Sequence, residues 1–154
     1  MAGGYKEREK RADARRVYGQ FKNVVAGQEH IAAMYQEEGK HNQAIAIYVK
    51  LLDLNGKNAA NYQWAIGACY ENMSQWKKAI GMYRQIDAFP KTHFAMASCH
   101  RRLSEQKEAI MLYNQCKVND AAAPRASLEI GFTYEEAKEP RNAIRTFQLT
   151  CKRY

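Results

Sequence analysis

Five segments of the chain repeat one pattern, an alanine followed four positions later by an aromatic residue. Their alanines lie 30, 35, 30 and 34 residues apart, and an apolar or small residue follows each aromatic after three more positions. Such spacings place the side chains on one stripe of a helix. The pattern therefore predicts five helices, each with a seam of alanine and aromatic side chains. The segments are Ala14–Tyr18, Ala44–Tyr48, Ala79–Tyr83, Ala109–Tyr113 and Ala143–Phe147.

A second helix is predicted upstream of four of these segments, across a short polar break. Each of these helices carries a small residue followed three positions later by an aromatic residue or histidine: Ala32 and Tyr35, Gly67 and Tyr70, Ala97 and His100, Gly131 and Tyr134. Two helices cross closely only where their side chains are small, so the crossing points are expected at Gly67, Ala79, Gly131 and Ala143. One such pair cannot bury both of its faces, so neighbouring pairs must stack.

The succession of small-x-x-Tyr and Ala-x-x-x-Tyr/Phe, repeated at intervals near 34 residues, resembles the tetratricopeptide repeat family over roughly residues 12–154. The resemblance implies an all-α fold, a right-handed superhelix of antiparallel helix pairs (an α-solenoid). Two departures are that Trp64 stands one position from the family's early tryptophan, and that His100 replaces a tyrosine. The expected division is an N-terminal helix at 1–25, which would be the second helix of a partial repeat, and four repeats at 26–58, 59–89, 90–121 and 122–154.

The last predicted helix has no polar capping helix behind it, although terminal repeats normally need one for solubility. We therefore expect either a fragment of a longer repeat protein or a protomer that covers its open end by self-association. Apolar or small residues at Ile144, Phe147 and Thr150 would then be left open.

The net charge of +8 raises the possibility of nucleic-acid binding. Much of the basic excess lies near the two ends, for example at Lys6, Arg8 and Lys22 and at Lys152 and Arg153, and acids and bases alternate between them. This distribution favours a solvated helical face over a nucleic-acid interface. No stretch approaches the roughly 18 apolar residues of a membrane span.

No set of residues with catalytic or metal-binding spacing is present. The four cysteines form no C-x2-C pair, and no histidine cluster completes a zinc set. His93 and His100 would lie two helical turns apart, roughly 10 Å. Phosphate-binding loops and nucleophile motifs are also missing. The sequence therefore predicts a protein that is not an enzyme, with no cofactor and no metal. Unpaired cysteines and the lack of a signal peptide in this chain favour the cytoplasm.

The resemblance implies a concave groove lined by the first helix of each repeat, where a partner peptide or helix binds. Trp64, Phe94 and Phe132 are placed on this surface, with packing into the helix pairs as the alternative for each. Arg101 and Arg102 form a cationic spot between acidic flanks, which suits a carboxylate or phosphate. The candidate partner-binding residues are Asn61, Trp64, Lys91, Phe94, Ser98, Arg101, Arg102, Leu128 and Phe132.

The predicted function is a protein–protein interaction scaffold that binds a peptide or helix of a partner in this groove. Two alternatives remain open at this stage. One is a nucleic-acid binder built on a basic helical array, and the other is a self-associating structural or assembly protein, a homo-oligomer through its uncapped ends.

Overall fold

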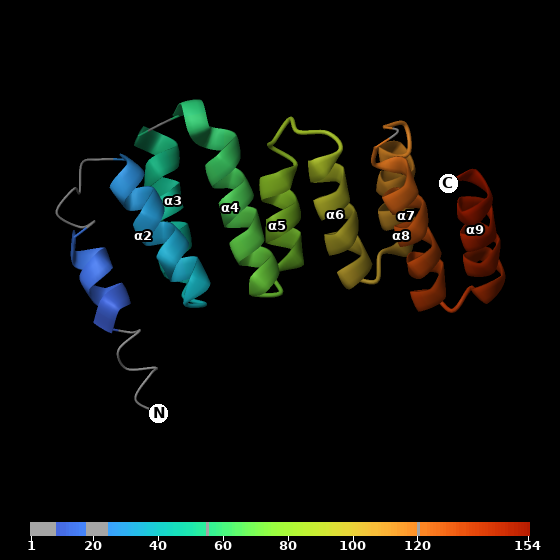
Figure 1. Cartoon of the computed structure of the whole chain (residues 1–154), viewed down its shortest axis with the longest axis horizontal. Coiled ribbons are helices and arrows are strands. Elements are labelled where there is room, and N and C mark those ends of the chain that lie inside the picture. The colour runs from blue at the N-terminus through green and yellow to red at the C-terminus, as the bar shows by residue number, and fades with distance from the viewer. Residues whose placement is uncertain (1–8, 18–24, 55, 120) are drawn as a thin grey trace. The chain divides into compact units, whose positions relative to one another are not determined.

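The computed structural model describes residues 9–17, 25–54, 56–119 and 121–154, and within them the secondary structure is helical with no strand. Residues 9–17 are helical. The helices that follow are α2 (Val25–Glu37), α3 (His41–Leu54), the short 3-10 helix η1 (Gly56–Asn58), α4 (Ala59–Asn72), α5 (Trp76–Tyr83), α6 (Lys91–Arg102), α7 (Gln106–Cys116), α8 (Ala123–Glu136) and α9 (Pro140–Arg153) (Figure 1). Tyr18, Phe21 and the bases Lys6, Arg8 and Lys22 lie outside the described residues.

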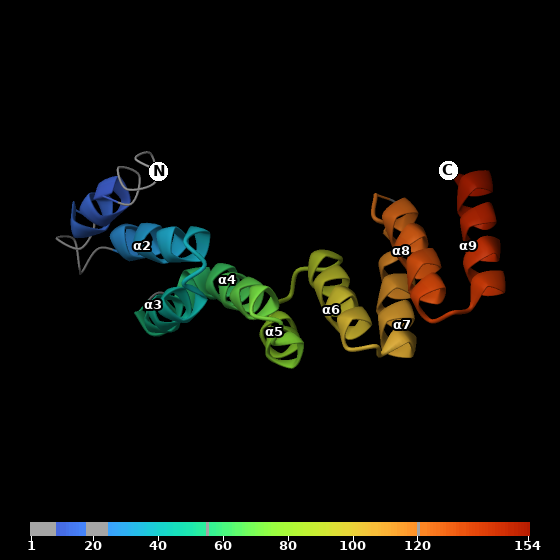
Figure 2. The same cartoon turned by 90° about the horizontal axis from the view of Figure 1, so that it is seen from below.

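The helices belong to two compact units, Met1–Ser74 and Gln75–Tyr154. In the first unit α2 packs against α3, and α3 against α4. In the second unit each helix from α5 to α9 packs against the next, and short turns join α6 to α7 and α8 to α9 (Figures 1 and 2). The division falls inside the range 59–89, so the repeat boundaries stay a prediction.

The alanines of the predicted seams on α3, α5, α7 and α9 are buried, whereas Ala14 is half-buried. Ala44, Ala79 and Ala109 have no exposed surface, and Ala143 is 4% exposed. The aromatic residues Tyr48, Tyr83 and Tyr113, one turn further along each helix, are buried as well. Small residues at the expected crossing points therefore let the helices approach, and the tyrosines fill the space beside them.

Left-handed residues follow α2, α6 and α8, the first helices of three pairs. Gly39, Ser104 and Lys138 have φ angles of 73°, 60° and 60°. The residue after each donates its N–H to a carbonyl five positions back: Lys40 to Tyr35 (2.8 Å), Glu105 to His100 (2.9 Å) and Glu139 to Tyr134 (2.9 Å). These bonds pair carbonyls that a helix end leaves unpaired, which explains how such short polar breaks reverse the chain.

One expectation at the last helix is wrong. Thr150 is 8% exposed and Phe147 is half-buried. Of the three residues expected to be open, only Ile144 is exposed, at 57%. The hydroxyl of Thr150 donates to the carbonyl of Thr146 at 2.8 Å, which allows this polar side chain to occupy an apolar position.

Candidate partner-binding faces

The nine predicted binding residues fall into two sets. Asn61 and Trp64 lie on α4 in the first unit. The other seven lie in the second unit, on the neighbouring helices α6 and α8. We call this second surface the α6–α8 face; it comprises Lys91, Phe94, Ser98, Arg101, Arg102, Leu128 and Phe132.

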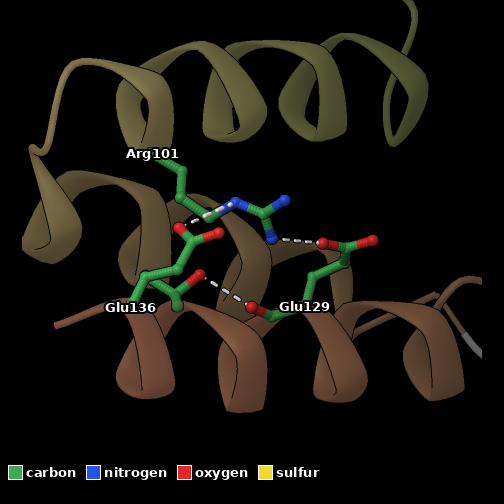
Figure 3. A network of polar contacts seen from close by, with 4 residues as sticks. Arg101, Glu129 and Glu136 are labelled. Atoms are coloured by element: carbon green, nitrogen blue, oxygen red, sulfur yellow. Dashed lines mark hydrogen bonds and ion pairs between the residues drawn. The ribbon is translucent and has the colours of Figure 1, made fainter. Parts of the chain in front are cut away.

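Arg101 holds α6 against α8 through two carboxylates (Figure 3). Its Nη1 donates to Oε2 of Glu129 at 2.6 Å, and its Nε lies 3.4 Å from Oε2 of Glu136. The Arg101 side chain is only 17% exposed. Its charge is therefore compensated within the protein. Arg101 links the two helices and is not an open site for a partner's carboxylate.

Phe94 is packed into the helix core of the second unit. Its ring meets Tyr113 edge to face with centroids 5.6 Å apart, and the guanidinium of Arg125 lies 5.2 Å from its centroid on the α8 side. It also borders the buried cluster that includes Ala97 and Ile130. Packing, the alternative left open for this residue, accounts for most of its surface.

Leu128 and Phe132 are the open apolar residues of this face. They lie one turn apart on α8 and are 41% and 45% exposed. Phe132 rests edge to face on Phe147, with ring centroids 5.3 Å apart, so its position is supported from behind. Lys91 and Arg102 are exposed at opposite ends of α6. The face thus offers an apolar centre with basic margins.

In the first unit, polar contacts tie α2 to its neighbours. Tyr62 donates to Glu29 at 2.6 Å, and Gln36 accepts from Tyr48 at 2.8 Å and donates to the thiol of Cys69 at 3.2 Å. Glu29 and Gln36 of α2 therefore already have hydrogen-bond partners within the unit.

On α4 itself, Asn61 is exposed and Trp64 is half-buried. Trp64 is thus neither a fully exposed anchor nor a core residue, and both interpretations of it stay open.

The cysteines have the properties of packing residues. Cys69, Cys99 and Cys116 are buried, Cys151 is exposed, and none of the four forms a disulfide. Burial raises the pKa of Cys116 to about 11 and also raises the pKa of Cys69. Because the thiolate is the nucleophile, neither thiol is activated for catalysis.

Nowhere in the described ranges do three or more His, Cys, Asp or Glu side chains gather as a metal site would require. None of the described helices has the length and hydrophobicity of a transmembrane span.

Two residues that organise the α6–α8 face were not predicted, Glu129 and Arg125. A signal for Glu129 exists in the sequence, because Glu129 and Glu136 are seven positions apart and so lie on the same side of α8. Arg125 has a similar relation to Leu128 and Phe132, three and seven positions away. Reading α8 at this spacing would have identified a second line of charged residues facing α6.

Comparison with known proteins agrees with the arrangement of helices. Residues 28–58 and residues 62–92 each match a sequence model described as tetratricopeptide repeat. The chain is a tetratricopeptide-repeat protein. Its all-α, helical-repeat (α-solenoid) fold is confirmed, while the handedness of the superhelix stays a prediction.

Solved structures similar to this tetratricopeptide-repeat protein include two of MamA. A crystal structure of MamA has a TM-score of 0.74 at 18% identity, covering 99% of this chain and 87% of that one. MamA from Desulfovibrio magneticus RS-1, from residue 41 to its end, has a TM-score of 0.75 at 15% identity, covering 95% and 86%.

A third similar structure, the nearly identical repeats of a putative kinesin light chain from Podospora anserina, has a TM-score of 0.72 at 15% identity, covering 98% and 90%. At these identities the three likenesses concern the fold. No curated protein sequence matches the chain.

Proposed function

We propose that this tetratricopeptide-repeat protein is a protein-interaction scaffold without catalytic activity, and that its α6–α8 face binds a peptide or helix of a partner protein. The observation that carries the proposal is the pair Leu128 and Phe132, large apolar side chains exposed one turn apart on α8. The repeat fold supports the general class, an interaction or assembly scaffold. The particular face is our inference.

Contacts within the protein order the side chains of the α6–α8 face before any partner arrives, and such preorganisation favours binding. The ion pairs of Arg101 with Glu129 and Glu136 fix the separation of α6 and α8, and Phe147 supports the ring of Phe132. Association loses less free energy when side chains are already ordered. Full burial of such a side chain contributes about 1.5–3 kcal/mol. Leu128 and Phe132 are 41% and 45% exposed, so covering what remains would contribute about 0.6–1.4 kcal/mol for each.

The same ion pairs narrow the class of partner. Since Arg101 already has two carboxylates, the face does not need an acidic group from a partner to neutralise it. We infer a segment that presents apolar side chains to Leu128 and Phe132. Asn61 and Trp64 on α4 are proposed as a further contact region of the first unit.

The test uses single substitutions that add no charge. A purified partner would first be found by affinity capture. Phe132→Ser and Leu128→Ser should each weaken its binding, measured by calorimetry, by about three- to tenfold. Val49→Ser on α3 is the matched control, because Val49 is 46% exposed, close to the 45% of Phe132. Circular dichroism checks that helicity is retained. Equal affinities for the three variants would remove the α6–α8 face as the binding surface.

Nucleic-acid binding is the competing hypothesis, motivated by the net charge of +8. Phosphate-driven binding would appear as strong, salt-dependent anisotropy changes with a labelled oligonucleotide at low salt. Such binding, unaffected by Phe132→Ser, would replace the proposal. Self-association is the third hypothesis, and Ile144 is the one of its three predicted open residues that is exposed. Concentration-dependent sedimentation that is lost in Ile144→Ser would favour it.

A further inference from the structure

A groove runs between α7 and α9, with α8 as its floor. Two adjoining hollows of about 830 and 610 Å3 make up this groove, and they share Asn114 of α7 and Tyr134 of α8 among their lining residues. Both α7 and α9 pack against α8, so the whole groove lies within the second unit. None of the nine residues predicted for partner binding lines it. We call it the α7–α9 groove.

The walls of the α7–α9 groove expose large apolar side chains. Met111 and Val118 on the α7 side are 55% and 79% exposed, and Leu149 on the α9 side is 58% exposed. Isolated exposed apolar residues are ordinary, but several that line one hollow mark an interaction surface. An occupant of the groove would remove these side chains from water.

The charge of the groove is strongly one-sided. Its ionisable lining residues other than tyrosine are four bases, Lys107, Lys117, Lys152 and Arg153, and one acid, Glu139. Three of the bases lie near the C-terminal ends of α7 and α9. This differs from the α6–α8 face, where two carboxylates compensate Arg101. An occupant of the α7–α9 groove therefore gains from negative charge.

The form of the groove favours a helix over an extended peptide. Its walls and floor are helices whose backbone groups already bond within each helix, so an extended peptide would find no backbone partners there. A helix satisfies its own backbone and needs only side-chain contacts. The 14 residues of α9 correspond to about 21 Å, the length of a helix of similar size.

We propose that the α7–α9 groove binds an acidic amphipathic helix of a partner protein. The apolar stripe of this helix packs on Met111, Val118 and Leu149. Its acidic flanks pair with Lys117 and Lys152. The site is separate from the α6–α8 face and does not depend on the function proposed for that face.

The probe is a fluorescein-labelled synthetic helix of about 18 residues, above the length at which isolated helices are marginal. Leucines at i, i+3, i+4 and i+7 form its stripe, and glutamates flank them. A second peptide carries lysine in place of every glutamate. Fluorescence anisotropy with the whole protein should give saturable binding of the acidic peptide, weakening several-fold at high salt, and much weaker binding of the basic peptide.

Matched pairs on α9 locate the binding site. Leu149→Ser should weaken binding of the acidic peptide about tenfold. Ile144 is equally exposed, at 57% against 58% for Leu149, but lies outside the groove, so Ile144→Ser should change the affinity less than twofold. Lys152→Glu should likewise weaken binding far more than Arg145→Glu.

Three results would overturn the proposal. They are no binding of the acidic peptide, equal binding of the basic peptide, and equal effects within either matched pair. The proposal would also be overturned if Phe132→Ser abolished binding of the acidic peptide and Leu149→Ser did not, because the peptide would then occupy the α6–α8 face. If the acidic peptide still binds the α7–α9 groove in Phe132→Ser, the groove proposal stands, and the function proposed for the α6–α8 face is decided by its own test.

Discussion

Because Gly131 lies against Phe147, the effect of Gly131→Ala on stability should change sign with the residue at position 147. A Cβ atom added at Gly131 would overlap the Phe147 ring, at 2.6 Å from Cζ and 2.7 Å from Cδ1. The ring has little room to move away, because its other side meets Phe132. Gly131→Ala therefore combines two opposed effects, a gain in helix propensity and a clash between α8 and α9.

The magnitudes decide which effect prevails. Replacing glycine by alanine inside a helix gains about 0.8–1 kcal/mol, and overpacking a filled site costs about 1–3 kcal/mol. In the natural chain Gly131→Ala should therefore lower the free energy of unfolding, by up to about 2 kcal/mol. In a Phe147→Leu background the ring is absent, so Gly131→Ala should raise the free energy of unfolding by up to about 1 kcal/mol.

Urea unfolding followed by circular dichroism measures the four variants of this double-mutant cycle, and the coupling should be at least about 1 kcal/mol. Gly81→Ala on α5 is the control, because a Cβ there meets nothing within 4 Å, so only the propensity gain remains. If Gly131→Ala stabilised the natural chain as much as Gly81→Ala does, the Phe147 ring would not be held over Gly131 and the assigned crossing point would be wrong.

Further substitutions test the turns, the Arg101 ion pairs and the core. Lys138→Gly should stabilise the protein by up to about 1 kcal/mol in urea, because φ is 60° there, and Gly39→Ala should do the reverse. Arg101→Glu should lower the melting temperature more than Arg101→Met, because it adds a carboxylate beside Glu129; equal losses would mean that the ion pair is irrelevant. Burial, with Glu129 nearby, raises the pKa of Tyr113 to about 12. The neutral Tyr113 therefore contributes about 2–3 kcal/mol to the free energy of unfolding relative to its ionised form. This contribution is complete below pH 10 and is lost as the pH rises through 12. Tyr113→Phe should flatten that alkaline loss in a pH series of urea melts.

The fold was predictable because its constraints are local and repeated. Ala79 and Ala109 are fully buried, as the spacing required, since a larger side chain at these positions would separate the helices. Ser104 and Lys138 show the limit of this inference. The polar breaks were evident, but their left-handed backbone was not, because neither residue is glycine.

The candidate site was only partly predictable, because side-chain pairing depends on distances between helices that are remote in sequence. The sequence placed Arg101 among acidic residues. It did not reveal that Glu129, 28 positions away, reaches Arg101 at 2.6 Å and leaves it mostly buried. Phe94 likewise became a packing residue only once Arg125 was known to lie over its ring. In each case the missing partner stands on α8.

Salt dependence separates the two surfaces proposed for the second unit. On the α6–α8 face Arg101 is paired internally, so a partner held by Leu128 and Phe132 should bind almost as tightly at high salt as at low salt. In the α7–α9 groove the bases outnumber the acids, so exposed charge pairs with a partner should be screened once the Debye length falls to a few ångströms, near 1 M salt. A natural partner can therefore be assigned to one surface from its affinity at two salt concentrations. Phe132→Ser and Leu149→Ser then check the assignment, and a salt-insensitive partner that depends on Leu149 alone would refute the electrostatic argument for the groove.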